Sequence, residues 1–416
     1  MVTRHIVGGM VAACVAAFSA VSTANADPLE AQFDQLVEAL EGKRVGLLTN
    51  PTAVDSQFQL IADRLHAHPD VDLAAFFAPE HGIRGDLQAG APEDDLIDPV
   101  TGLPVYSLYG PRRSPTPEQI EDLDVVVFDI QDVGARFYTY QWTMTNVMEA
   151  CAEHGKSFVV FDRPNPIGMD KMQGAPNTFD VGLIGRKWPD APFGIPTRHG
   201  LTVGELAILV NEEWMDPQVD LTVIEVPGLT RDMTFEETGY PWVLPSPNMP
   251  TLETAFVYTG MCLFEGVNIS EGRGTTRPFE LVGAPWIEGH ELAEHLNAKG
   301  LPGVRFRPAW FQPTFSTHAG DRCGGIQVHV TDRDAFEPVR TGIHVLKAIT
   351  ELYPDDVNVR NGVSRLMGVE NLHTRIWDED PDDIVAEWQG NLQAFKDLVE
   401  PHLLYDDGAG NGWNIE

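Results

Sequence analysis

The sequence predicts an α/β protein, built on a doubly wound parallel sheet and completed by a smaller α+β domain. In the first half, strand-like runs alternate with helix-like segments, which is the pattern of βαβ units. Several of the runs are continuously apolar, as expected of strands that are covered on both faces. The expected strands are residues 44–49, 72–79, 104–108, 125–130, 158–161 and 221–226, and the expected helices are residues 58–67, 116–123, 139–154 and 201–214.

Local signals support the ends of these helices and the division into domains. Pro117 stands at a helix start, Gly155 at a helix end, and Thr202 with Glu205 is spaced as a capping box. The Pro-rich stretch 241–250 indicates a boundary, so we expect a first domain over 27–240 and a smaller one over 241–416. In the second, the expected helices are 254–265, 291–298, 335–352 and 383–399, and the expected strands are 304–308 and 325–331.

The first 26 residues have the features of an export signal. Arg4 precedes the apolar run 6–21, and Ala24-Asn25-Ala26 has the A-x-A form of a cleavage site. We therefore expect a periplasmic or secreted protein that begins at Asp27 and has no membrane anchor. The alternative is a lipoprotein signal ending at Cys14.

Charge and missing motifs exclude several functional classes. The chain has 28 basic and 62 acidic residues, a formal net charge of −34, which argues against nucleic acid as a partner. An anionic ligand would have to be held by a local cluster of arginines. The sequence contains no Walker A, G-x-S-x-G, H-E-x-x-H or C-x-x-C motif and no G-x-G-x-x-G after the first strand. We therefore expect neither a cofactor nor a metal, and the oligomeric state stays open.

Three of the expected strands run directly into a carboxylate. Because ligands of open α/β sheets bind outside the carboxyl ends of the strands, acids gathered there indicate an active site. The alternative is that each acid caps the helix that follows it. The acids are Glu80, Asp129 and Asp162, with Arg84, Arg136 and Arg163 close by in the sequence.

The segment 77–85 (FAPEHGIRG) places Glu80 and His81 in a turn after an apolar strand. A carboxyl group beside Phe76 and Phe77 would be partly desolvated, which raises its pKa, as a general acid requires. The alternative is a structural turn with a buried, paired glutamate.

Two further segments combine charged groups with aromatic rings or glycines. Residues 128–140 (FDIQDVGARFYTY) suit a sugar, whose ring faces are apolar and whose rim is hydroxylated. Residues 264–279 (FEGVNISEGRGTTRPF) form a polar, Gly-rich loop that could close over the sheet edge from the second domain. The alternatives are helix capping by Asp132 with Phe137 and Tyr138 in the core, and an ordinary surface loop.

At these segments the sequence resembles the exo-acting β-N-acetylmuramidases, a family long catalogued as a domain of unknown function. The resemblance runs from about Val45 to the C-terminus. It is carried by VGLLTNPT, FAPEHGIRG, VVVFDIQDVGARFYTY, VVFDRPNPIG, PTRHGLTVGELA, LPSPNMPTLETAFVYTG and LFEGVNISEGRGTTRPFE.

The resemblance implies a Rossmann-like first domain, a smaller partner domain and a site between them. It also implies release of N-acetylmuramic acid from the non-reducing end of peptidoglycan fragments. The Glu of the EHG block is the expected catalytic residue, and it falls on Glu80, the residue that the turn itself indicates.

The remaining roles follow from glycosidase chemistry. A second carboxylate is expected, either Asp129 or Glu271, unless the substrate's 2-acetamido group replaces the nucleophile. Because guanidinium binds carboxylate in a bidentate fork, arginines are candidates for the lactyl carboxylate. The candidate substrate contacts are Arg84, Arg136 and Arg273 for that carboxylate, Tyr138 and Trp142 for the sugar ring, and His81, Arg163 and Asn248 beside them.

Two other classes of function stay open at this point. A catalytically inactive muropeptide-binding protein would keep the arginines and aromatic residues but would tolerate the loss of Glu80. A metal-dependent hydrolase would use Asp129, Asp162, His81 and His199, and a chelator would abolish its activity.

Overall fold

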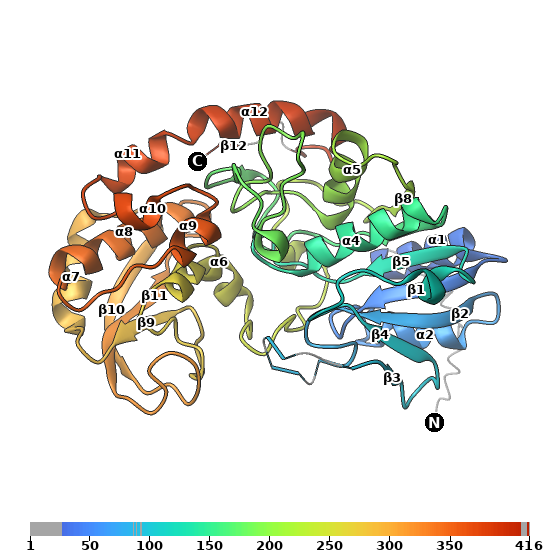
Figure 1. Cartoon of the computed structure of the whole chain (residues 1–416), viewed down its shortest axis with the longest axis horizontal. Coiled ribbons are helices and arrows are strands. Elements are labelled where there is room, and N and C mark those ends of the chain that lie inside the picture. The colour runs from blue at the N-terminus through green and yellow to red at the C-terminus, as the bar shows by residue number, and fades with distance from the viewer. Residues whose placement is uncertain (1–26, 86, 89, 92–93, 409–413, 416) are drawn as a thin grey trace, which may run out of the picture.

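The computed structural model describes residues 27–85, 87–88, 90–91, 94–408 and 414–415, and it shows two lobes side by side (Figure 1). The predicted signal peptide lies outside the described residues. The first lobe is built on a seven-stranded sheet in the order β3-β4-β2-β1-β5-β6-β8, parallel except for β3. Its strands are β1 (Arg44–Thr49), β2 (Asp72–Ala78), β3 (Leu96–Ile97), β4 (Pro104–Ser107), β5 (Val125–Asp129), β6 (Ser157–Phe161) and β8 (Asp220–Ile224).

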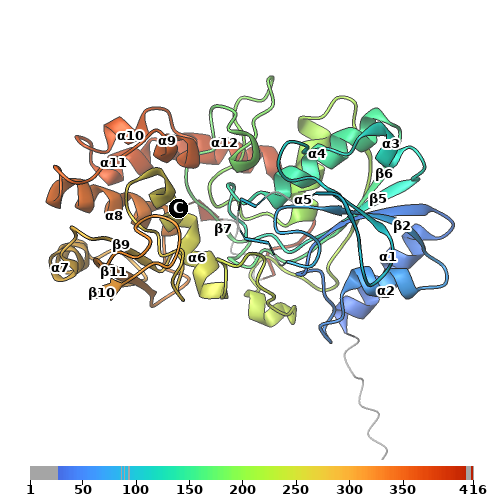
Figure 2. The ribbon, with the colours of Figure 1, turned by 60° about the horizontal axis from the view of Figure 1, so that its bottom comes forward.

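Helices cover both faces of this sheet, which confirms the predicted doubly wound architecture. Figure 2 shows α3 and α4 above the sheet and α1 and α2 below it. The predicted capping box of Thr202 and Glu205 is present at the start of α5. The helices are α1 (Pro28–Leu40), which the sequence analysis did not predict, α2 (Ile61–Ala67), α3 (Pro117–Ile120), α4 (Tyr140–Glu153) and α5 (Val203–Glu213), with 3-10 turns η1 (Gly182–Ile184) and η2 (Phe235–Thr238).

The second lobe packs helices against a three-stranded antiparallel sheet in the order β10-β11-β9. The helix expected over 254–265 ends at Met261 and continues as a 3-10 turn, and the one expected over 383–399 is two helices. Its elements are α6 (Leu252–Met261), η3 (Cys262–Gly266), β9 (Leu281–Ala284), α7 (Gly289–Lys299), β10 (Val304–Phe311), β11 (Cys323–Val330), α8 (Pro338–Leu352), α9 (Gly362–Met367), α10 (Leu372–Arg375) and α11 (Pro381–Ala386).

The C-terminal segment returns to the first lobe. Helix α12 (Gln389–Val399) arches over both lobes in Figure 1, and the ring of its Phe395 lies 6.3 Å from that of Phe193. After η4 (Glu400–His402), strand β12 (Asn414–Ile415) pairs with β7 (Lys171–Met172). The boundary predicted at residue 240 therefore stays a prediction, because the chain crosses between the lobes more than once. No helix in the described ranges is long and apolar enough to span a bilayer.

Candidate functional site

The three strand-end carboxylates lie along one edge of the first-lobe sheet, as predicted. Strand β2 runs into the turn that carries Glu80, β5 ends at Asp129, and Asp162 directly follows β6. Because β2, β1, β5 and β6 are parallel neighbours, their carboxyl ends share this edge. The surroundings of the three groups nevertheless differ.

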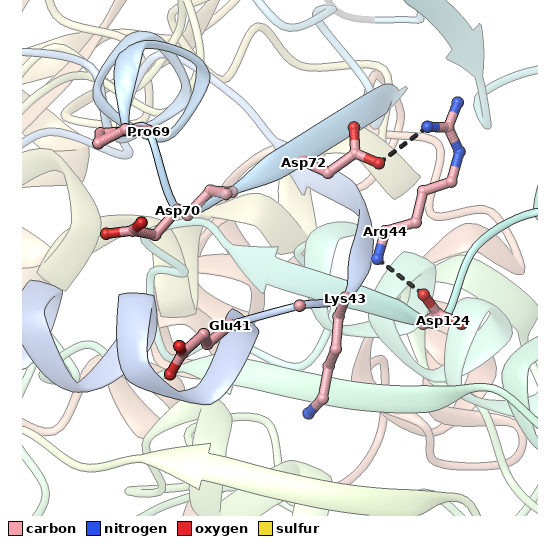
Figure 3. Close-up of a pocket in the computed structure, with 9 residues that line it drawn as sticks. Glu41, Lys43, Arg44, Pro69, Asp70, Asp72 and Asp124 are labelled. Atoms are coloured by element: carbon pink, nitrogen blue, oxygen red, sulfur yellow. Dashed lines mark hydrogen bonds and ion pairs between the residues drawn. The ribbon is translucent and has the colours of Figure 1, made fainter.

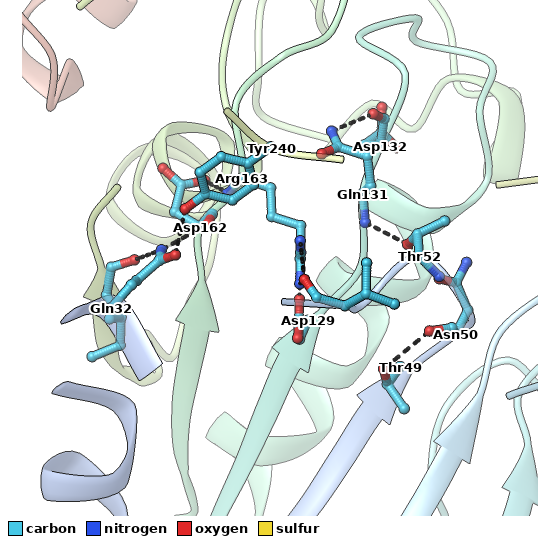
Figure 4. Close-up of polar contacts among 12 residues, drawn as sticks. Gln32, Thr49, Asn50, Thr52, Asp129, Gln131, Asp132, Asp162, Arg163 and Tyr240 are labelled. Atoms are coloured by element: carbon cyan, nitrogen blue, oxygen red, sulfur yellow. Dashed lines mark hydrogen bonds and ion pairs between the residues drawn. The ribbon is translucent and has the colours of Figure 1, made fainter. Parts of the chain in front are cut away.

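Asp129 belongs to a buried ion pair. Its Oδ1 accepts a 2.6 Å hydrogen bond from Arg163 Nε, and both side chains are buried (Figure 4). The same guanidinium also donates to the carbonyl of Val54. Burial raises the pKa of Asp129, and Arg163 opposes that rise.

Asp162 is saturated with hydrogen-bond donors. It accepts from the backbone N–H groups of Arg163 (2.9 Å) and Gly204 (2.7 Å), the latter in the first turn of α5. The hydroxyls of Thr202 (2.7 Å) and Tyr405 (2.6 Å) donate to its other oxygen. Asp162 therefore accepts a hydrogen bond from a backbone N–H group in the first turn of α5, and through Tyr405 it binds the C-terminal segment to the sheet.

Glu80 is only half-buried, and both of its carboxylate oxygens accept hydrogen bonds. Oε1 accepts from the backbone N–H of Gly90 and Oε2 from the hydroxyl of Thr139, both at 2.9 Å. The turn that presents it needs left-handed backbone at His81 (φ 75°) and Gly82 (φ 74°). The His81 ring stabilises this turn through Nδ1, which lies 2.9 Å from the carbonyl oxygen of Leu87.

Three tyrosines lie close enough to Glu80 for its charge to raise their pKa values. Burial, and then the charge of Glu80, raises the pKa of Tyr109 and of Tyr140, and Glu80 contributes to the same effect at Tyr138. These phenols stay protonated at neutral pH. The Tyr140 hydroxyl also donates to the carbonyl of Pro245, which connects α4 to the segment that carries Asn248.

The second lobe contributes the Gly-rich loop that follows η3. Arg273 contacts Glu265 and lies 3.6 Å from Glu271 Oε1, with its guanidinium 5.0 Å from the Phe279 ring centroid. Burial raises the pKa of Glu271, and Arg273 opposes that rise. The positive charge of Arg273 also lowers the pKa of Tyr109, so the loop reaches the surroundings of Glu80 electrostatically.

A cavity of about 700 Å³ lies between the lobes beside these groups, although neither Glu80 nor Glu271 is among its described lining residues. Its lining includes Gly90, which holds Glu80, and Ser316, whose hydroxyl lies 3.5 Å from Glu271 Oε1. Two donor atoms in this lining have no hydrogen-bond partner among the described residues, namely Nδ2 of the buried Asn248 and Nε of Arg273. The described lining is completed by Gln88 and Phe315.

The sequence matches two protein-family models. One is described as "Exo-beta-N-acetylmuramidase NamZ, N-terminal" and covers residues 45–253, and the other as "Exo-beta-N-acetylmuramidase NamZ, C-terminal" and covers residues 256–405. It is 45% identical over 405 residues to the peptidoglycan β-N-acetylmuramidase NamZ of Bacillus subtilis, covering 96% of each chain. The chain belongs to the exo-β-N-acetylmuramidase NamZ family.

Two solved structures share the fold of this chain. Both are of DUF1343 family proteins from Bacteroides fragilis. The first superposes with a TM-score of 0.82 at 37% identity, over 91% of this chain and 98% of the other. The second has a TM-score of 0.69 at 28% identity, over 90% and 98%.

Several predicted site residues of this NamZ-family chain pair with other groups of the same chain and do not line the cavity. Arg84 pairs with Asp63 (3.1 Å) and Asp98 (2.8 Å). Arg136 is fully buried and donates to the carbonyls of Ala175, Ile195 and Leu366 at 2.7–2.9 Å, and burial lowers its pKa to about 9. Their predicted contacts with substrate, like that of the ion-paired Arg163, stay predictions.

Trp142, one of the two residues expected at a sugar platform, lies in the core. Its side chain is fully buried, and its Nε1 donates at 2.6 Å to the carbonyl of Arg136. The other, Tyr138, packs edge-on against Tyr140 and Tyr258, with ring centroids 5.0 and 5.9 Å away.

The sequence analysis missed three groups that contact or adjoin Glu80. Thr139 and Gly90 donate to its carboxylate, and Tyr109 follows β4, the strand next to β2. Thr139 directly follows the predicted Tyr138, so its position in the segment 128–140 could have indicated a place near the site. No sequence pattern showed that residues 90 and 109 would return to the Glu80 turn.

A second large cavity, of about 690 Å³, lies at the opposite, amino edge of the sheet (Figure 3). Arg44 there pairs with Asp72 at 2.9 Å, and its backbone N–H donates to Asp124. None of the predicted site residues is among the described residues that line it. Ligands of open α/β sheets bind at the carboxyl ends of strands, so we place the site at the first cavity.

His199, which the metal-dependent alternative would use, is buried, and burial lowers its pKa to about 3. Its Nδ1 accepts a hydrogen bond from the backbone N–H of Leu201. Within the described part of the chain, no three His, Cys, Asp or Glu side chains are grouped so that they could hold a metal ion.

Proposed function

We propose that this protein is a glycosidase that removes N-acetylmuramic acid from the non-reducing end of peptidoglycan fragments, with Glu80 as the general acid. Membership of the NamZ family supports the reaction, and so does the Bacillus subtilis relative, whose name gives peptidoglycan as its substrate. The observation that carries the proposal is the placement of Glu80, half-buried in the turn after β2 and bonded to cavity-lining Gly90.

The contacts of Glu80 suit a group that gives up a proton and takes it back. The Gly90 N–H fixes one oxygen and stabilises the carboxylate that remains after the glycosidic oxygen has been protonated. The Thr139 hydroxyl at the other oxygen can donate to the carboxylate and accept from the carboxylic acid. Both protonation states of Glu80 therefore keep two hydrogen bonds.

Glu271 is the better placed of the two candidates for the second carboxylate. It lies beside Arg273 and Ser316, which both line the cavity, whereas Asp129 is held in its ion pair with Arg163. Glycosidases generally use two carboxyl groups, and their separation decides the stereochemical outcome. The substrate's 2-acetamido group is the alternative nucleophile.

Arg273 is the cationic residue of the described cavity lining, and we assign the lactyl carboxylate to it. Its side chain is 21% exposed, so part of it is accessible from the cavity.

The test is hydrolysis of a chromogenic β-N-acetylmuramic acid glycoside, compared with the matching N-acetylglucosamine glycoside, with and without chelator. We expect turnover of the muramic substrate, a much lower kcat/KM for the other sugar, and no effect of chelator. Binding without turnover would indicate a muropeptide-binding protein, and loss of activity with chelator a metal-dependent hydrolase. Equal kcat/KM for the two sugars would refute the carboxylate pocket.

We further propose that the protein is exported and begins at Asp27. In the structure, Asp27 is the N-cap of α1, where its Oδ1 accepts from the N–H of Leu29 at 3.0 Å. Mass spectrometry of the exported protein should give Asp27 as the first residue. An acylated Cys14 at that position would contradict the proposal.

A further inference from the structure

A third cavity, of about 660 Å³, adjoins the cavity of about 700 Å³ beside Glu80, and we call the two the outer and the inner cavity. They share Gln88, Asn248 and Phe315 among their described lining residues, so an elongated ligand can occupy both. Trp310, which is 51% exposed, is in the described lining of the outer cavity and not of the inner one. The two cavities therefore form one continuous depression.

Trp310 is supported from within the second lobe. It lies near the end of β10, and its ring is 5.4 Å from that of His290, tilted by 57°. Its partner across the sheet is Gly324, a residue without a side chain that could cover the indole. Neighbouring Phe311, Gln312 and Thr314 complete this wall of the cavity. An exposed indole in such a groove offers an apolar face to a ligand.

The charge of the outer cavity differs from that of the inner one. None of the described residues that line it is acidic or basic, although the chain carries a net charge of −34. The inner cavity contains Arg273. The combined depression therefore suits a ligand with an anionic group at its inner end and a neutral part at its outer end. A peptide with ionised groups would find no counter-charge in the outer part of the described lining.

We propose that the outer cavity binds the neutral N-acetylhexosamine on the reducing side of the scissile bond, with Trp310 and Phe315 as its stacking surface. This rests on the proposed function, which places the muramic acid residue in the inner cavity. The C–H face of a pyranose stacks on aromatic rings, while amides and hydroxyls such as those of Gln312 and Thr314 serve its hydroxylated rim.

The test compares two substrates that differ only beyond the scissile bond. One is a disaccharide of N-acetylmuramic acid β-linked to N-acetylglucosamine, and the other is the β-fluoride of N-acetylmuramic acid, whose leaving group occupies no sugar subsite. For Trp310→Ala, we expect the loss of kcat/KM on the disaccharide to exceed the loss on the fluoride by about tenfold or more. Trp310→Phe should recover most of the difference, because it restores an aromatic face.

Phe58→Ala is the matched control, since Phe58 is an aromatic residue with 65% exposure that lines neither cavity among the described residues. It should leave the ratio of the two substrates unchanged. Equal losses on both substrates for Trp310→Ala would overturn the subsite, as would a loss confined to peptide-bearing fragments. A change in sedimentation mass with unaltered disaccharide kinetics would assign Trp310 to self-association instead. If the wild-type protein hydrolyses neither substrate, the proposed function is refuted. That result differs from equal losses in Trp310→Ala, which refute only the subsite.

Discussion

The carboxyl edge of the sheet has two parts with opposite character. Where β5 and β6 end, Asp129 and Asp162 are buried, Asp129 in an ion pair with Arg163 and Asp162 among hydroxyl and backbone donors. Where β2 ends, Glu80 is half-buried and accepts a hydrogen bond from a residue of the cavity lining. The two parts of the edge thus differ in burial and in access to the cavity, and the proposed general acid lies at the accessible one.

The difference also explains which arginine faces the ligand. Arg163 is committed to Asp129 inside the first lobe, while Arg273 reaches the cavity from a loop of the second lobe and keeps an unpartnered Nε–H within the described residues. The part of the edge that contains Glu80 is therefore completed by the loop of the second lobe, and the part that contains Asp162 by the returning C-terminal segment.

The largest expected effect concerns the structural half. Arg163→Ala leaves Asp129 buried without its cation, which should lower the free energy of unfolding by about 3–5 kcal/mol. Chemical denaturation measures the loss. The control is Arg44→Ala, which breaks an exposed pair with Asp72 at the amino edge and should cost less than about 1 kcal/mol. Similar losses in the two variants would mean that the buried pair has no special structural role. If Arg163→Ala does not fold, Asp129→Asn should retain a measurable transition.

The next effect separates Arg273 from the structural arginines. Arg273→Ala should raise KM for the muramic substrate by a factor equivalent to roughly 2–3 kcal/mol, because a charge-assisted contact is lost. Arg277→Ala is the control, since this residue of the same loop pairs with Glu280 at 3.4 Å and does not line the catalytic cavity among its described residues. Steady-state kinetics on both variants should show the rise for Arg273 alone. An unchanged KM for Arg273→Ala would move the carboxylate pocket elsewhere.

A more gradual effect, spread over several pH units, should appear in the pH dependence of stability. Asp132 is buried without a cationic partner among the described residues, and burial raises its pKa to about 7 from an ordinary value of 3.8. Between about pH 4 and 7 the folded chain keeps a proton that the unfolded chain has lost, so the free energy of unfolding falls as pH rises. The contribution of this group is at most about 1.4 kcal/mol per pH unit. Subtracting the profile of Asp132→Asn isolates it, and identical profiles would show that Asp132 does not titrate in this window.

The sequence predicted the parts of the site that depend on strand order. Alternating strands and helices located the sheet edge, and the apolar run before Glu80 located the turn. It could not predict which arginine would line the cavity, because Arg84, Arg136 and Arg163 find their partners through contacts that are distant along the chain, such as Leu366 for Arg136. The return of the C-terminal segment to Asp162 depends in the same way on long-range packing.

Leaving-group dependence of the Glu80→Gln variant tests the central claim most directly. A general acid matters most when the leaving group is a sugar hydroxyl and least when it is an activated phenol that departs without protonation. The kcat of Glu80→Gln should therefore fall at least about a hundredfold on the disaccharide and far less on a dinitrophenyl glycoside, with thermal stability unchanged. A loss of the same size on both substrates, or activity within a few-fold of wild type on the disaccharide, would contradict the role of Glu80 as general acid.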